Sequence, residues 1–277
     1  MSPQRIHTVI AAGVDNPALI ARWRAQPELL RGHGVEPSQV DLDALWRFAG
    51  LTIKVRHHAL REELPASFRL MNLAGLEIEL FASYASERAA QGARLAPTTE
   101  GRTLDLLGFL EGWLDRDNTA HALLWDLIRH ERALARLPRT ALAVGTSPDL
   151  RRSEPPTPPA ADVVPRIRGE IMLHEMTSDP QAVARALDDP RLDLAAIPRM
   201  QSRACYWRTD AATDGGPGVS ILQFGELAFG ALALVDGKRT AAEVYRALGG
   251  GRRPPPSFLR ILGELQTIGL IALRPQL

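Results

Sequence analysis

The first half of the chain carries apolar residues at helical spacing. Its clearest stripe consists of Leu42, Leu45, Trp46, Ala49, Ile53, Leu60 and Leu64. Side chains three or four residues apart share one face of a helix, so this spacing indicates amphipathic helices that pack together. Capping residues and prolines predict five helices, at about residues 17–26, 41–63, 66–91, 100–115 and 118–137. An antiparallel bundle with short loops is the simplest arrangement of these helices.

The pattern changes in the second half, where short strands are mixed with short helices. The predicted strands are residues 168–174, 203–208, 219–224 and 269–273. The second and third of these are joined by a turn-rich segment, which predicts a hairpin. A helix is predicted at 179–187, and three short helices precede the last strand. From Ser220 onward this order is typical of a small winged-helix unit.

Prolines crowd the segment between the two halves, from Ser147 to Pro165. Proline at this density blocks helices and favours an extended spacer, so we place the domain boundary there. The predicted fold class is α+β, with an N-terminal all-α helical bundle followed by a C-terminal winged-helix domain. The predicted domains are a helical docking domain at 1–146, a proline-rich linker at 147–166 and the winged-helix domain at 167–277.

Composition narrows the class of protein without naming a function. The 277 residues are 45% hydrophobic and 23% charged, which is ordinary for one large or two smaller globular domains. With a net charge of +1, the chain lacks the large positive charge that would attract nucleic acid or an anionic membrane. The single cysteine, Cys205, excludes an internal disulfide and a cysteine-rich metal site. Since neither a membrane-spanning run nor a signal peptide is visible, we expect a soluble cytoplasmic protein.

Three charged residues fall on apolar faces of the predicted helices. Glu77, Glu131 and Arg56 each lie among aliphatic positions on a helical wheel, and His57 follows Arg56 directly. A buried unpaired charge costs several kcal/mol, so such groups pair internally or face a partner. We therefore consider an internal ion network of Arg56 with Glu77 or Glu131, a surface that docks a partner protein, and a metal site.

Spacing argues against the metal site. His121 and Glu131 lie ten residues apart on one helix, about 15 Å along its axis, so they cannot hold one ion together. The chain also lacks the Glu-x-x-His pairs of di-iron bundles, a P-loop, a Rossmann glycine motif and a nucleophile elbow. We therefore predict no catalytic residue and no metal or other cofactor in this chain.

Gly108 and Gly112 share a helical face with Asp105, Glu111 and Asp115. Small residues four apart let another backbone approach closely. The pattern suits either an internal helix crossing or a surface for a partner.

The winged-helix unit could bind DNA, another protein or a peptide. DNA binding needs a basic recognition helix, whereas the candidate helix at 257–268 carries Glu264 as well as Arg260. Peptide capture needs an open strand edge beside an apolar groove. The hairpin and the neighbouring helix could supply both, through Tyr206, Trp207, Arg208, Phe224, Phe258, Arg260 and Ile261.

Core packing is the competing role for these apolar side chains. We expect it for Phe258, Leu262 and Leu265. Tyr206 and Trp207 are neighbours on a strand, so one of the two rings must point away from the core and could form a groove wall.

The C-terminal unit resembles the PqqD-like recognition domains of peptide-modifying systems. The resemblance lies in Leu-Ala-Phe-Gly-Ala-Leu-Ala-Leu-Val-Asp-Gly-Lys-Arg-Thr at 227–240, Ala-Ala-Glu-Val at 241–244 and Ile-Gly-Leu-Ile at 268–271. It covers about a quarter of the chain. Such domains bind the leader segment of a ribosomally made precursor peptide, which is what the resemblance implies here.

The helical half resembles the partner proteins of multinuclear non-haem iron-dependent oxidative enzymes (MNIOs). The similar segments are 48–51, 55–61, 64–65, 68–71 and 75–84. In that family a TIM-barrel iron enzyme modifies a precursor peptide, and a second protein docks on it and delivers the peptide. The resemblance implies that iron belongs to the partner enzyme, and it assigns no individual functional residue in the helical half.

Together these observations predict a non-catalytic subunit that binds a leader peptide and presents it to an MNIO-type enzyme, without binding nucleic acid or membrane. One alternative is a winged-helix DNA-binding regulator with a helical sensing domain. Another is a helical metal oxidase that uses Glu77 and Glu131 as ligands.

Overall fold

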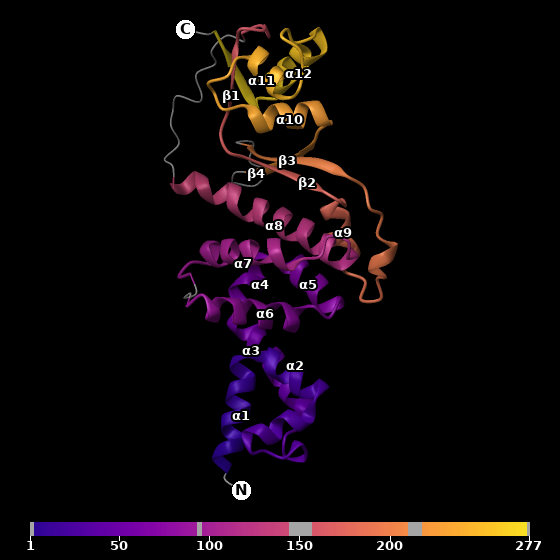
Figure 1. Cartoon of the computed structure of the whole chain (residues 1–277). Helices are drawn as coiled ribbons and strands as arrows, with labels where there is room; N and C mark the ends of the chain where they lie inside the picture. Colours follow the sequence, from indigo (N-terminus) through magenta and orange to yellow (C-terminus); the bar gives the residue numbers. More distant parts are fainter. Residues whose placement is uncertain (1–2, 93–95, 144–156, 210–217, 276–277) are drawn as a thin grey trace. The chain divides into compact units, whose positions relative to one another are not determined.

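The computed structural model describes residues 3–92, 96–143, 157–209 and 218–275 (Figure 1). It is a mixed α+β structure that is mostly helical, with its antiparallel strands in the C-terminal part. The chain forms two compact units. Unit 1 comprises residues 1–131 and 182–196, and unit 2 comprises residues 132–181 and 197–277.

Helices make up the first half of the described chain. They are α1 (Pro3–Asp15), α2 (Pro17–Ala25), α3 (Leu42–Arg56), α4 (His58–Glu63), α5 (Pro65–Leu73), α6 (Glu77–Ala90), α7 (Thr99–Trp113) and α8 (Thr119–Ala143). Two short 3₁₀ helices, η1 (Pro27–His33) and η2 (Pro37–Gln39), connect α2 to α3. The prediction of helices through this half is confirmed, but α1 and both 3₁₀ helices were not among the predicted elements.

The predicted helix starts depend on caps that the structure contains. The Asn16 side chain accepts a hydrogen bond from the Ala18 N–H at 3.2 Å, and Asp41 accepts one from the Ala44 N–H at 2.9 Å. Each bond satisfies a backbone donor that the first turn of a helix leaves open.

Two of the predicted helices are each divided in the structure. The helix predicted at 41–63 breaks at His57 into α3 and α4. The helix predicted at 66–91 breaks after α5, where Gly75 has a φ of 69°. That left-handed conformation suits glycine and ends a helix.

Helix α8 continues past the end that the sequence predicts. Pro138 was expected to stop it, yet α8 runs to Ala143. Proline lacks an N–H, so the Leu134 carbonyl loses its helical partner. Leu134 is 37% exposed, so water can take that bond. The boundary between the two units falls within α8, at residues 131 and 132, whereas the predicted linker at 147–166 lies partly outside the described residues.

The interior of unit 1 contains the apolar stripe that the sequence predicts. Leu45, Ala49, Ile53, Leu60 and Leu64 are all buried. A close contact between α3 and α6 completes this packing. A Cβ placed on Gly50 would lie 2.9 Å from Cδ1 of Ile78, so the end of the Ile78 side chain would have to shift to make room for a larger residue.

Unit 2 contains the strands β1 (Val164–Ile167), β2 (Ile171–Met176), β3 (Ser202–Thr209), β4 (Gly218–Gln223) and β5 (Ile271–Arg274). Strands β2, β3 and β4 form an antiparallel sheet in that order, and β1 pairs with β5. Its helices α10 (Glu226–Leu234), α11 (Ala241–Ala247) and α12 (Pro256–Thr267) follow β4. The predicted hairpin, three short helices and last strand are confirmed.

The remaining elements lie between β2 and β3. They are α9 (Pro180–Ala186) and the 3₁₀ helix η4 (Leu194–Ala196). Most of this connection belongs to unit 1, and Arg69 of α5 forms an ion pair with Asp188 there.

Candidate functional site

The candidate peptide-binding residues lie on β3, directly after β4 and on α12, and both faces of the three-stranded sheet of unit 2 are covered. Ala204 and Tyr206 of β3 pack in a buried cluster with Ala133 and Leu137 of α8. Cys205 of β3 points the other way, into a second cluster with residues of α10, α11 and α12. Figure 1 shows the sheet between α8 and α10. Successive side chains of β3 point to opposite faces of the sheet, so Tyr206 and Cys205 belong to two different cores.

The prediction that one ring of the Tyr206–Trp207 pair forms an exposed groove wall is wrong for Tyr206. Tyr206 does point away from the core built by α10–α12, but its exposed fraction is 0% because α8 covers that face. In a strand with one covered face, every second side chain is exposed to solvent. In a strand between two layers, the side chains on both faces are covered. Trp207 is half-buried and packs against the α10–α12 cluster.

The aromatic and aliphatic candidates outside β3 have different exposures. Phe258 is fully buried in the α10–α12 cluster with Leu262 and Leu265, which confirms the expected core role of all three. Phe224 and Ile261 are half-buried and pack at the margin of the same cluster. These two side chains combine core contacts with accessible surface.

Strand β4 is an edge strand of the described sheet, since it pairs with β3 alone. The Phe224 N–H donates to the Arg203 carbonyl at 3.0 Å, which marks residues 203 and 224 as a hydrogen-bonded pair. In an antiparallel ladder, hydrogen-bonded and non-hydrogen-bonded pairs alternate. The backbone N–H and C=O groups of Val219, Ile221 and Gln223 therefore point away from β3, towards the open edge. This open edge is what strand addition requires, and Phe224 directly follows β4.

The two candidate arginines near this sheet differ in exposure. Arg260 is exposed on α12, and its Nε lies 4.0 Å from Oε1 of Glu264. Arg208 is half-buried on β3. Because an exposed pair at that distance is weak, the Arg260 guanidinium stays accessible to an acidic group of a ligand.

Glu131, a candidate for partner docking or an internal network, caps a helix inside unit 1. Its Oε1 accepts a hydrogen bond from the Ala66 N–H at 2.7 Å, and its Oε2 accepts from the Ser67 N–H at 2.9 Å and the Ser67 hydroxyl at 2.6 Å. Leu64, at the N-cap of α5, makes no side-chain cap bond. The carboxylate thus replaces the missing local cap and meets the positive end of the helix dipole.

Solvation and hydrogen bonding act in opposite directions on this carboxyl group. Burial raises the pKa of Glu131, while the hydrogen bonds from Ser67 and Ala66 oppose that rise.

Glu77 is also buried and has internal partners. It forms an ion pair with Arg61, and Nζ of Lys54 lies 4.0 Å from its Oε2. The Arg61 guanidinium also lies over the Phe68 ring, 4.8 Å from the centroid. An internal network therefore exists, but its cations are Arg61 and Lys54.

The predicted role of Arg56 in that network is wrong. Arg56 is exposed at the last turn of α3, and its side chain makes no ion pair with any carboxylate in the described part of the chain. The helical wheel placed Arg56 on the same side of α3 as the buried Leu45 and Ala49, but Arg56 is the last residue of α3, where its long side chain can reach solvent.

His57 is buried in the turn between α3 and α4. Its ring stacks on Phe81 with 4.2 Å between centroids. Burial, and then the positive charges of Arg56 and Arg102, lower the pKa of His57 to about 4. The ring is therefore a neutral core group near pH 7, and neither His57, Glu77 nor Glu131 is accessible for docking.

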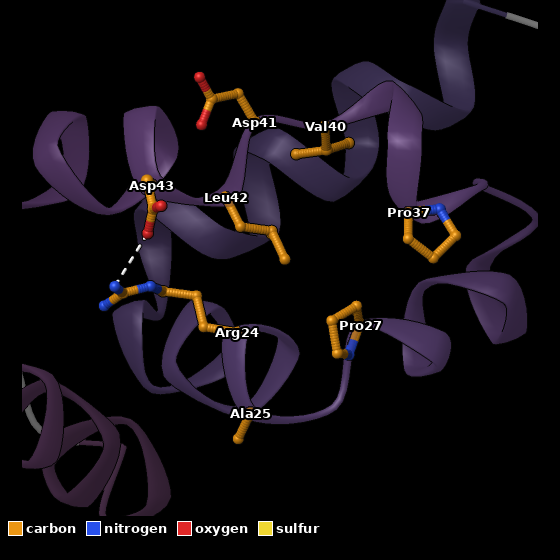
Figure 2. A pocket seen from close by; sticks show the side chains of 8 residues that line it. All are labelled: Arg24, Ala25, Pro27, Pro37, Val40, Asp41, Leu42 and Asp43. Carbon is orange, nitrogen blue, oxygen red and sulfur yellow. Dashed lines mark ion pairs between the residues drawn. The ribbon is translucent and has the colours of Figure 1, made fainter.

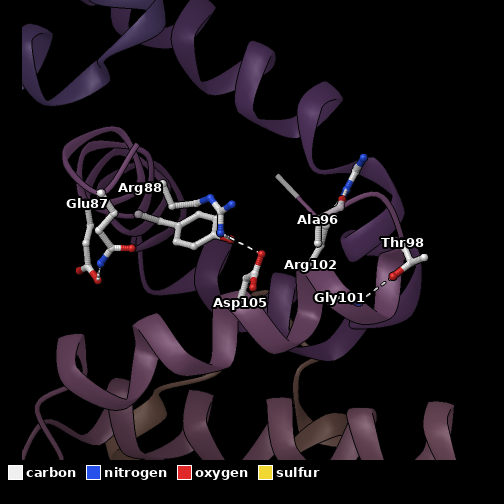
Figure 3. Close-up of polar contacts among 9 residues, drawn as sticks. Glu87, Arg88, Ala96, Thr98, Gly101, Arg102 and Asp105 are labelled. Atoms are coloured by element: carbon white, nitrogen blue, oxygen red, sulfur yellow. Dashed lines mark hydrogen bonds and ion pairs between the residues drawn. The ribbon is translucent and has the colours of Figure 1, made fainter. Parts of the chain in front are cut away.

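The small-residue face of α7 is open within unit 1. A Cβ placed on Gly108 or Gly112 would meet no atom within 4 Å, so the expected internal helix crossing is absent from the described residues. Asp105 is held by Arg88 of α6 at 2.8 Å, and Arg102 donates to the Ala96 carbonyl at 2.9 Å (Figure 3). The first contact joins α6 to α7, and the second ties α7 to the segment that precedes it.

A shallow recess in unit 1 lacks the composition of a catalytic site. It is lined by Arg24, Ala25, Pro27, Pro37, Val40, Asp41, Leu42 and Asp43 (Figure 2). Arg24 and Asp43 are paired at 2.8 Å, and Asp41 caps α3. Its charged groups thus already have structural roles.

The described residues contain no group of three histidine, cysteine or acidic side chains placed to hold a metal ion. His121 was considered above as a metal ligand together with Glu131. Its Nδ1 accepts a hydrogen bond from the Asp115 N–H at 3.1 Å. Burial raises the pKa of the Cys205 thiol to about 12, which leaves it unreactive near pH 7.

Comparison with known proteins finds no family model and no curated protein that matches this chain. Within the described ranges, every helix is too short or too polar to cross a membrane.

Proposed function

We propose that this chain is a non-catalytic subunit that binds the leader of a ribosomally made precursor peptide and presents it to an MNIO-type iron enzyme. The leader adds as a strand to the open edge of β4. Iron belongs to the partner enzyme, and this chain contributes binding and a high local concentration of the modifiable residue.

The free edge of β4 is the observation that carries this proposal. Outward backbone groups at Val219, Ile221 and Gln223 offer hydrogen bonds to a strand, and an exposed edge is a template for pairing. Phe224, which directly follows β4, offers half-buried apolar surface, and Ile261 and Arg260 of α12 offer further apolar surface and a positive charge in the same unit. The PqqD-like pattern at 227–244 supports a peptide as the added strand.

A DNA-binding regulator is the competing function. Arg252 and Arg253 are exposed just before α12, which would suit a phosphate backbone. The α12 surface itself pairs Arg260 with Glu264, and a carboxylate on a recognition helix repels phosphate.

A backbone substitution on β4 tests strand addition. Gln223→Pro removes one outward N–H and leaves the ladder bonds to β3 in place, because that N–H does not donate to β3. Gln223→Ala is the matched control, since it removes the exposed side chain but keeps the N–H. Fluorescence anisotropy with synthetic leader peptides of the precursors encoded beside this gene measures binding.

We expect Gln223→Pro to weaken leader binding by roughly tenfold, the value of about one hydrogen bond, and Gln223→Ala to change it little. Equal affinity of both variants and the wild type would refute binding at β4. Salt-dependent binding of a random DNA duplex, with no binding of any leader, would favour the regulator instead.

A further inference from the structure

Strand β4 differs from the other described edge strands of unit 2 in the residue types that it carries. Edge strands normally carry charged residues or proline, which hinder pairing with a further strand. Strand β2 has Glu175, β1 has Pro165 and Arg166, and β5 has Arg274. The six residues of β4, Gly218–Gln223, include neither a charged residue nor a proline. Among the described edge strands, β4 is therefore the one without these obstacles to pairing.

The apolar side chains of β4 lie on both faces of the sheet. Val219 and Ile221 pack at the margin of the cluster that contains Tyr206 and residues of α8. Leu222 points to the other face and packs at the margin of the α10–α12 cluster. All three side chains are only half-buried, so each leaves apolar surface towards the open edge. A strand that adds to β4 therefore meets apolar surface on both of its faces.

The order of apolar and polar residues along β4 determines what the added strand should carry. Residues directly opposite each other on paired strands share one face of the sheet and contact each other. Apolar partners are therefore favoured opposite Val219, Ile221 and Leu222, whereas the positions opposite Ser220 and the exposed Gln223 have no apolar neighbour on β4. Every described strand pair is antiparallel, and antiparallel pairing is slightly more stable per residue than parallel pairing. We therefore expect the added strand to run antiparallel to β4.

We propose that β4 selects leader segments with the order apolar, apolar, any residue, apolar, read from the N-terminus to the C-terminus of the leader. In the antiparallel orientation the first two apolar residues lie opposite Leu222 and Ile221, and the last lies opposite Val219. This inference rests on the proposed function and names the class of leader sequence that the site takes. A leader with strictly alternating apolar and polar residues fits less well, because it covers the apolar side chains on one face of β4 only.

A serine scan of the leader tests this order. The probe is the fluorescein-labelled synthetic leader of the precursor encoded beside this gene, and its affinity for the full chain is measured by fluorescence anisotropy. Serine at each of the three apolar positions should weaken binding by about fivefold, because a half-buried aliphatic contact is lost. Serine at the unrestricted position between them should change the affinity by less than about twofold, which makes it the matched control. A sensitive segment that alternates strictly, or that has the reverse order, would overturn the proposal.

A charge placed on β4 tests the register of the leader. Gln223→Glu alters an exposed side chain at the end of β4 and keeps its shape. The variant should prefer lysine over glutamate by about threefold at the leader position just before the first apolar residue, since that position lies opposite residue 223. The same exchange at the unrestricted position, which lies on the other face, is the control and should have little effect. Equal affinity of Gln223→Glu for the lysine and glutamate leaders would refute this register.

Two further outcomes separate this inference from the proposed function. If Gln223→Pro weakens leader binding but serine at the apolar leader positions does not, strand addition at β4 stands and the selected order is refuted. If the wild type binds no leader peptide, the proposed function fails and the inference fails with it.

Discussion

The two units differ in the polar groups that they bury. Unit 1 buries ionisable side chains, namely His57, Glu77, Asp126, His130 and Glu131. Among the described residues, the polar residues buried as a whole in unit 2 are Ser178 and Thr240, and single nitrogen atoms of His174 and Arg208 are buried there as well. Backbone geometry accounts for two of the buried residues. Glu131 accepts hydrogen bonds from the first N–H groups of α5, and Thr240 accepts one from the first turn of α11.

The difference also determines where each unit offers binding surface. In unit 1 the candidates Glu77 and Glu131 have internal partners, and Phe48, Leu51 and Val55 of α3 are exposed. In unit 2 the aromatic candidates pack into two cores, and the free surface is the backbone edge of β4. Several of the acidic and aromatic residues that the sequence suggested as binding groups are therefore buried. The free surfaces consist of apolar side chains in unit 1 and backbone groups in unit 2.

The largest expected effect tests the double-sided core of unit 2. Tyr206→Ala should lower the free energy of unfolding by about 4 kcal/mol, because it opens a cavity between β3 and α8. Hydrogen exchange would report faster exchange in the strands of unit 2 and little change in α1–α3. An exchange pattern like that of the wild type would contradict the burial of this ring.

Removing the carboxylate that caps α5 tests the main polar contact of unit 1. Glu131→Leu should lower the free energy of unfolding by about 3 kcal/mol, since two buried N–H groups and a hydroxyl lose their acceptor. Glu79→Leu, at an exposed position of α6, is the control and should change stability by less than about 0.5 kcal/mol. A stabilised Glu131→Leu protein would mean that this carboxylate faces a partner instead.

Acidification should destabilise unit 1 more than unit 2. The pKa of His57 in the folded state, about 4, lies below its unfolded value of about 6.5. Neutral His57 therefore favours folding above pH 6.5, and that contribution, on the order of 2 kcal/mol, is lost as the pH falls from 6.5 towards 4. His57→Phe keeps the stacking on Phe81 and should reduce the pH dependence of the thermal melting temperature in this window. An unchanged profile would exclude His57 as its source.

The smallest effect concerns a cap in unit 2. Thr240 and Glu243 form a capping box, in which the Glu243 N–H donates to the Thr240 hydroxyl oxygen at 3.3 Å and the Thr240 N–H donates to the Glu243 carboxylate at 2.8 Å. Thr240→Ala should lower the free energy of unfolding by about 1 kcal/mol, and Thr240→Ser should restore most of it. Urea unfolding measures both, and equal loss in the two variants would show that the threonine methyl group, rather than the cap, is responsible.

Local signals in the sequence determined much of the secondary structure. Asn16 and Asp41 predicted helix starts, and the turn-rich segment between two strand-like runs predicted β3 and β4, because caps and turns are encoded over a few residues. The exposed residues Phe48, Leu51 and Val55 also recur at helical spacing, opposite the buried stripe of α3.

Tertiary structure alone decided the partners of the buried groups. Ala66 and Ser67 lie more than sixty residues before Glu131, and no local pattern links a carboxylate on α8 to the first turn of α5. Tyr206 likewise depends on whether a second layer covers its face of the sheet. Periodicity shows which side of an element a residue occupies, but only the assembled fold shows what lies on that side, because the contact joins segments that are distant in the chain.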